Sequence, residues 1–142
     1  MSHSLTRVYV HLVWSTWRRT PWIDAAVERT IRDAIAKQAE RLECALHAFG
    51  ASDDHVHTLL ELNRSTTLVV LVRALKGASG RVTNMNHREL NFRWQEGYGA
   101  FSVSERDPQP VIEYIRNQRE RHATGAIDSD WEPTATQAAD TE

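Results

Sequence analysis

Residues 44–62 read CALHAFGASDDHVHTLLEL and hold two short runs of strand-forming residues separated by a polar turn. The first run, residues 44–50, and the second, residues 55–62, predict an antiparallel hairpin. Side chains two positions apart on a strand point to the same face. His55 and His57 therefore project together, and Val56 faces the opposite side of the sheet.

Further elements are predicted on both sides of this hairpin. Residues 5–15 (LTRVYVHLVWS) and 100–104 (AFSVS) are typical of strands, and residues 84–100 otherwise resemble a loop. Helices are predicted to begin at suitable capping residues: Asp24, Thr66 or Thr67, and the Asp107-Pro108 pair. The order β-α-β-β-α-β-α predicts an α+β fold, with a ferredoxin-like antiparallel sheet packed with helices and a C-terminal helix that carries Tyr114.

The chain has 142 residues, which suits one compact domain, expected over residues 1–122. The acidic stretch 123–142 contains five Asp or Glu residues and no Lys or Arg, and we expect it to be a disordered tail. Residues 1–122 consequently hold 14 acidic and 17 basic residues, a net charge of +3. Fifteen of the basic residues are Arg, which suits phosphate binding but is explained equally well by a GC-rich genome.

The sequence also suggests a cellular location. Its single cysteine, Cys44, excludes an internal disulfide and fits a reducing compartment. No apolar run approaches the ~20 residues that a membrane helix needs, and the N-terminus does not resemble a secretory signal. We therefore expect a cytoplasmic protein with no membrane association.

The histidine pair has two interpretations. Two imidazoles on one face of a strand can bind a divalent metal, but they can also be ordinary histidines on a half-exposed strand. Asp54 is either a partner that orients an imidazole or a turn residue, and the turn interpretation is favoured. Leu59 occupies the position where a third alternating histidine would fall, which argues against a hydrolase with a histidine nucleophile.

The stretch VIEYIRNQ places Tyr114 and Gln118 one turn apart on the same face of a helix. Tyrosine is a weak nucleophile at its ordinary pKa of ~10 and needs an activated target. The Gln118 carbonyl oxygen is a possible metal ligand. Taken alone, however, the pattern also fits an amphipathic helix whose tyrosine packs at the edge.

The ordered set of stretches is more specific than any one of them. HLVWSTWRRTPW, DDHVHTLLEL, LVRALKGASGRV, FRWQEGYGAFSVS and VIEYIRNQ together cover about residues 11–122. In this order they resemble the IS200/IS605-like single-tyrosine (HUH) transposases, including relatives associated with repetitive extragenic palindromes (REP). One departure is Asp53, at a position where relatives often have Pro; we expect it to alter the turn and not the chemistry.

The resemblance implies a metal-dependent DNA strand transferase. It implies that His55, His57 and Gln118 hold Mg²⁺ or Mn²⁺, and that Tyr114 attacks a phosphodiester of single-stranded DNA to leave a 5′-phosphotyrosine. The implied partners are single-stranded DNA with palindromic hairpins and a second copy of the chain in a homodimer.

Other residues are candidates for contact with DNA. Three basic residues of the second helix are either phosphate contacts or part of a solvated face: Arg73, Lys76 and Arg81. Three tryptophans either stack on unpaired bases or, as favoured, pack in a core or a dimer interface: Trp14, Trp17 and Trp22. Two alternatives remain open, a domesticated hairpin-DNA-binding protein of the same fold without transposition activity, and a plain ferredoxin-like dimer or metal-binding module.

Overall fold

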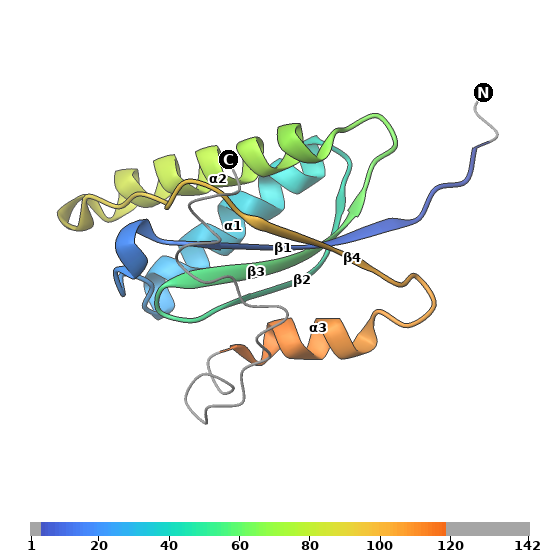
Figure 1. Ribbon diagram of the computed structural model, residues 1–142. Helices are drawn as coiled ribbons and strands as arrows, with labels where there is room; N and C mark the ends of the chain where they lie inside the picture. The colour runs from blue at the N-terminus through green and yellow to red at the C-terminus, as the bar shows by residue number, and fades with distance from the viewer. Residues whose placement is uncertain (1–3, 119–142) are drawn as a thin grey trace.

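A computed structural model describes residues 4–118 of the chain, which form a single four-stranded antiparallel sheet with helices on both faces (Figure 1). The strand order is β2-β3-β1-β4, with β1 and β3 in the centre. The strands are β1 (Val8–Ser15), β2 (Ala45–Ala51), β3 (His55–Leu62) and β4 (Gly99–Val103). The helices are α1 (Ala25–Arg41), α2 (Leu68–Asn86) and α3 (Gln109–Arg116), with short 3-10 turns η1 (Trp17–Arg19) and η2 (Arg88–Leu90). The predicted α+β ferredoxin-like fold is confirmed; the predicted acidic tail lies outside the described residues.

The hairpin of β2 and β3 forms in the predicted place. Gly50 of β2 lies opposite His57 of β3, and on the other side His57 pairs with Val13 of β1. A register irregularity between Leu46 and Ala48 interrupts the regular pairing of β2 near its start. His57 therefore occupies the interior of the sheet, with a strand on each side.

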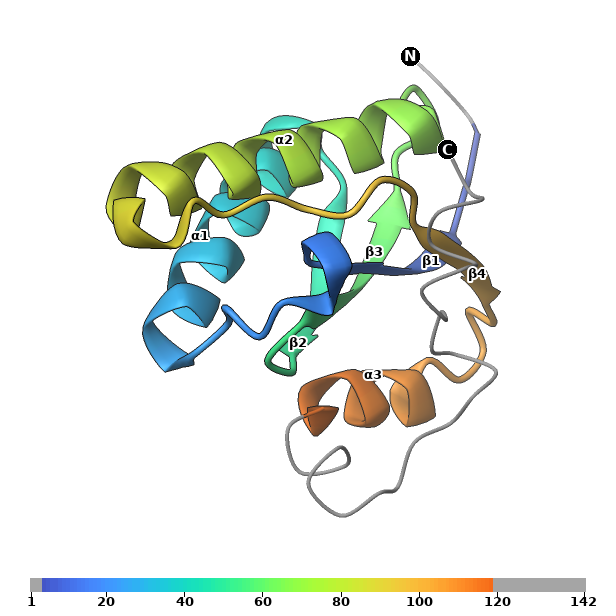
Figure 2. The ribbon, with the colours of Figure 1, turned by 60° about the vertical axis from the view of Figure 1, so that its left-hand side comes forward.

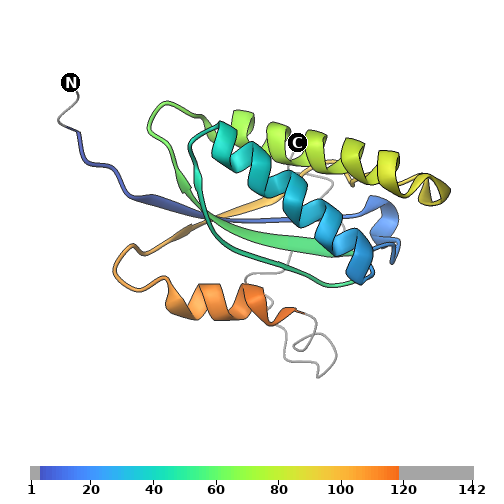
Figure 3. The ribbon, with the colours of Figure 1, turned by 180° about the vertical axis from the view of Figure 1, so that it is seen from behind.

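Helices α1 and α2 cover one face of the sheet (Figures 1 and 3). The side chains of Asp24 and Thr67 cap them by accepting hydrogen bonds from the backbone N–H groups of Val27 and Val70. Their apolar stripes pack on alternate residues of β1 and β3, including Leu12, Trp14, Val56 and Leu60. These contacts form the main core.

Helix α2 is longer than the sequence suggested. The prediction of a loop from residue 84 is wrong for residues 84–86, which continue the helix to Asn86. Thr83 is fully buried, and Asn84 Nδ2 donates a hydrogen bond to the Phe92 carbonyl oxygen at 2.5 Å. Tertiary contacts therefore extend the helix past the point where its apolar pattern fades.

Helix α3 packs alone on the opposite face of the sheet (Figure 2). A second, smaller apolar cluster holds it there: Ala48, Leu59, Val111, Ile112 and Ile115. The helix begins next to the predicted Asp107-Pro108 pair, but Pro108 is the capping residue and Gln109 the first helical one, and no side chain in the described part of the chain caps the helix, so the predicted cap at Asp107 is wrong. Among residues 4–118, no helix is long and apolar enough to cross a membrane.

Candidate metal and tyrosine site

The two histidines of β3 lie on the sheet face that α3 covers. Both side chains are fully buried, and their ring centroids are 5.1 Å apart with the planes at 68°. The expectation that they project from one face together is met. The alternative interpretation expected two ordinary histidines on a half-exposed strand. The strand is instead buried at both histidines.

Hydrogen bonds engage the Nδ1 atom of each ring. His57 Nδ1 lies 2.8 Å from His11 Nε2, and His55 Nδ1 lies 2.8 Å from Ser52 Oγ and 2.7 Å from Asp54 Oδ1. A histidine that binds a metal through one nitrogen commonly has its other nitrogen oriented by such a partner. Each ring therefore has Nε2 as the nitrogen suited to bind a metal.

Asp54 serves both roles that were considered for it. It lies in the turn between β2 and β3, and its carboxylate also contacts His55 and forms an ion pair with Arg19 (Nε to Oδ2, 3.1 Å). Burial raises the pKa of the Asp54 carboxyl, but the His55 hydrogen bond and the Arg19 charge outweigh burial and lower that pKa overall. Asp54 is therefore ionised near neutral pH and can hold the His55 ring in place.

Helix α3 places Tyr114 beside His57, and Gln118 follows two residues after the helix ends at Arg116. The Tyr114 ring is 2% exposed, and its centroid lies 5.7 Å from that of His57 with the planes at 81°. Gln118 is fully buried; its Nε2 donates to the Tyr114 carbonyl oxygen at 2.8 Å. Within residues 4–118, Gln118 Oε1 accepts no hydrogen bond. A buried amide oxygen that accepts no hydrogen bond from these residues is well suited to bind a cation.

A glycine allows α3 to approach the sheet this closely. A Cβ atom built on Gly50 would lie 1.7 Å from the Ile115 carbonyl oxygen and 3.4 Å from Gln118 Cγ. Gly50 is also the strand partner of His57. The last turn of α3 therefore lies directly over the His57 position, and a side chain at residue 50 is incompatible with that placement.

The available donors form a mixed set. In residues 4–118, no three or more His, Cys, Asp or Glu side chains are grouped to hold a metal. His55, His57 and Gln118 instead offer two imidazole nitrogens and one amide oxygen, a combination that suits divalent first-row cations and accommodates Mg²⁺ less readily. The residues present therefore fit a divalent metal.

The candidate DNA contacts lie elsewhere. Arg73 and Arg81 are exposed on α2, across the sheet from the histidines. Lys76 Nζ donates to the carbonyl oxygens of Gln95 and Gly97, at 2.8 Å each, and so anchors the segment before β4. The structure does not bring these three basic residues together with His55 and Tyr114.

The tryptophans differ among themselves. Trp14 is fully buried in the main core, and Trp22 packs against that core, as the favoured interpretation expected. Trp17 is half-buried just after β1, where the Arg93 guanidinium lies 4.0 Å from its ring centroid.

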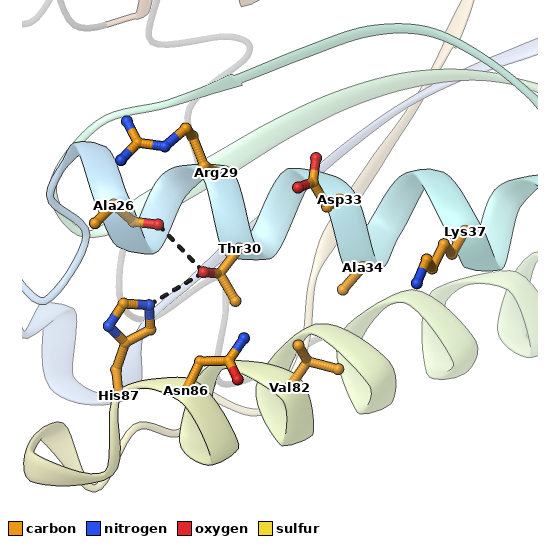
Figure 4. A pocket seen from close by; sticks show the side chains of 9 residues that line it. All are labelled: Ala26, Arg29, Thr30, Asp33, Ala34, Lys37, Val82, Asn86 and His87. Atoms are coloured by element: carbon orange, nitrogen blue, oxygen red, sulfur yellow. Dashed lines mark hydrogen bonds between the residues drawn. The ribbon is translucent and has the colours of Figure 1, made fainter.

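An open cavity of 560 Å³ lies between α1 and α2 (Figure 4). It is on the sheet face away from the histidines and does not include them.

Sequence reasoning missed several residues of the site. His11, Ser52 and Arg19 orient the histidines or Asp54, and Gly50 admits α3. The alternating pattern of β1 could have placed His11 on one face, but its pairing with His57 depends on strand register. No local signal marked Gly50.

The sequence of the described residues matches a known family of proteins. The family model described as "Transposase IS200 like" matches residues 4–118, and the chain belongs to this family of transposases. The chain is 26% identical over 117 residues to the ISDra2 transposase TnpA of Deinococcus radiodurans, covering 78% of this chain and 84% of the relative.

Two solved structures have the same fold. A crystal structure of a transposase from Deinococcus radiodurans R1 has a TM-score of 0.70 and 26% identity, covering 84% of this chain and 96% of the other. A REP-associated tyrosine transposase bound to a REP hairpin has a TM-score of 0.63 at 15% identity, covering 100% of this chain and 95% of the other. The second likeness, at this identity, concerns the fold.

Proposed function

We propose that this transposase cleaves and rejoins single-stranded DNA through a covalent 5′-phosphotyrosine at Tyr114, with a divalent metal, Mg²⁺ or Mn²⁺, held by His55, His57 and Gln118. One observation carries the proposal: Tyr114 packs against His57, and the buried Gln118, whose oxygen accepts no hydrogen bond from residues 4–118, lies next to Gly50, the strand partner of His57. This placement supports one buried site that holds both the nucleophile and the metal ligands.

The chemistry follows from these positions. Tyr114 Oη attacks the phosphorus in line, a new P–O bond forms to the tyrosine, and the bond to the 3′-oxygen breaks. The tyrosine loses its proton and the departing 3′-oxygen gains one. When bound, the metal would polarise the scissile phosphate as a Lewis acid. A DNA 3′-OH can reverse the step, so strands are joined without ATP.

The residues around the site hold the reacting groups in position. His11, Ser52 and Asp54 hold the imidazole rings, and the Gly50 contact holds α3. Such positioning supplies much of the rate in phosphoryl transfer, because reacting groups need little further ordering.

The proposed partner is single-stranded DNA with palindromic hairpins. Support comes from the family and from a similarly folded tyrosine transposase whose structure holds a REP hairpin. We also propose a homodimer, on the family resemblance, and a cytoplasmic location, on the single cysteine Cys44. A domesticated DNA-binding protein without transposition activity is the second candidate, and the presence of Tyr114 beside His57 favours the enzyme.

Covalent trapping tests the proposal. Incubated with Mn²⁺ and single-stranded oligonucleotides from the palindromic ends that flank its gene, the protein should form an adduct that survives denaturation. Tyr114→Phe should bind DNA and form none, because the attacking oxygen is gone. Tyr98→Phe is the matched control and should form adduct normally. No adduct with the wild-type protein would favour the binding-only alternative.

A further inference from the structure

We infer that Arg18 and Arg93, held against the Trp17 ring, form a phosphate-binding clamp for the single strand that enters the histidine–tyrosine site; this inference rests on the proposed function. The clamp is defined as Trp17, Arg18 and Arg93.

The clamp lies at the same end of the sheet as the site. η1 directly follows β1, whose last residue Ser15 pairs with His55. Figure 1 shows this blue turn and the end of α3 at one end of the sheet, and Figure 3 agrees from behind. Arg19, beside the clamp, bonds Asp54, which in turn bonds His55. Trp17 therefore lies two residues after Ser15, the residue of β1 that pairs with His55. Single-stranded DNA that leaves the site toward this end of the sheet would meet the clamp.

Arg18 and Arg93 are exposed, and both guanidinium groups lie over the Trp17 ring. The Arg93 carbon Cζ lies 4.0 Å from the Trp17 ring centroid and that of Arg18 lies 5.3 Å from it. An arginine stacked on a ring uses its flat face for the ring and keeps its N–H edge for phosphate oxygens. Less side-chain freedom is then lost on binding.

The backbone holds the clamp in place as well. Trp17 N donates to the Arg93 carbonyl oxygen at 3.0 Å, and Arg18 N donates to Gln95 Oε1 at 3.0 Å. Arg18 and Arg19 both adopt positive φ, 53° and 56°, a conformation that costs non-glycine residues energy. Strained backbone that the surroundings maintain is often found at functional sites.

The charges leave both arginines available. Within residues 4–118 neither Arg18 nor Arg93 forms an ion pair with a carboxylate, whereas Arg19 neutralises Asp54. Two exposed carboxylates belong to neighbouring segments: Glu96 follows Arg93 in the chain, and Asp53 precedes Asp54, the partner of Arg19. The clamp's attraction for phosphate therefore depends on the two stacked guanidinium groups and not on a surplus of positive charge at this end of the sheet.

Salt-dependent binding tests the clamp. In a Tyr114→Phe background, anisotropy of a fluorescein-labelled oligothymidylate gives the slope of log affinity against log salt. Arg18→Gln with Arg93→Gln should make the slope shallower by about 1.4, because each phosphate contact with a single strand contributes ~0.7. The matched control is Arg29→Gln with Lys37→Gln, which removes two charges from the cavity of Figure 4 and should leave the slope unchanged.

Two further results complete the test. Trp17→Leu keeps both charges but removes the ring, and it should weaken binding if stacking orders the arginines. An unchanged slope in the Arg18/Arg93 variant, or an equal change in the control, overturns the clamp. Absence of adduct in the wild-type protein, together with a flattened slope in the clamp variant, would refute the cleavage chemistry and leave the clamp standing.

Discussion

His11 Nε2 lies 2.8 Å from His57 Nδ1, and both rings are fully buried, so each ring's orientation depends on the other. Hydrogen bonding at one nitrogen of a histidine decides which nitrogen can bind a metal. We therefore expect His11 to fix the tautomer of His57 with its proton on Nδ1, so that the Nε2 lone pair is available.

Replacing His11 should weaken metal binding without removing a ligand. His11→Leu should lower Mn²⁺ affinity 10- to 100-fold, the usual effect of losing a partner that orients a ligand. Titration calorimetry measures this. His11→Gln keeps an acceptor for the His57 proton and should recover most of the affinity. Equal Mn²⁺ affinity in the wild-type and leucine proteins would show that His11 only fills the core.

The metal ligands themselves should show a larger effect. The wild-type protein should bind about one Mn²⁺ per chain, and His57→Ala should abolish both binding and cleavage, because two remaining donors hold the ion poorly. His47→Ala is the control, since His47 is a half-buried histidine of β2 that contacts Tyr9 and Glu61. Calorimetry that gave the same Mn²⁺ affinity for His57→Ala and wild type would remove the histidine pair from the mechanism.

Gly50→Ala should separate the tyrosine helix from the sheet. Its new Cβ would overlap the Ile115 carbonyl oxygen, so α3 must shift, and adduct formation should fall at least tenfold while circular dichroism still reports a folded sheet. Gly77→Ala is a matched control: a Cβ there meets nothing within 4 Å, and alanine in this exposed helix position should stabilise the protein by about 0.5–1 kcal/mol. Full activity of Gly50→Ala would mean that the site does not need α3 in this position.

Asp54→Asn should reduce both metal affinity and stability. The lowered pKa of Asp54 means that its carboxylate stabilises the fold at pH values above its ordinary pKa of 3.8, and that this contribution disappears as pH falls through the lower folded-state pKa. The free energy of unfolding, measured by urea denaturation, should therefore favour the wild-type protein near pH 7 and differ little in strong acid. A difference independent of pH would assign the effect to packing.

Local pattern was sufficient for most of the architecture. The alternation in β3, the caps Asp24 and Thr67, and Pro108 before α3 act over a few residues, so they can be read without knowing the fold. The end of α2 could not be read in this way. Its last turn depends on two tertiary features: the burial of Thr83 and the hydrogen bond from Asn84 to the Phe92 carbonyl oxygen.

Periodicity alone placed His55 and His57 on one strand face and predicted Tyr114 and Gln118 one helical turn apart, because the periods of strand and helix are intrinsic to the backbone. That Tyr114 meets His57 follows from the tertiary fold. Their meeting depends on strand register, which places Gly50 and His11 at His57, and on a contact too close for any side chain larger than hydrogen. Such relationships join residues far apart in the chain, and local periodicity does not encode them.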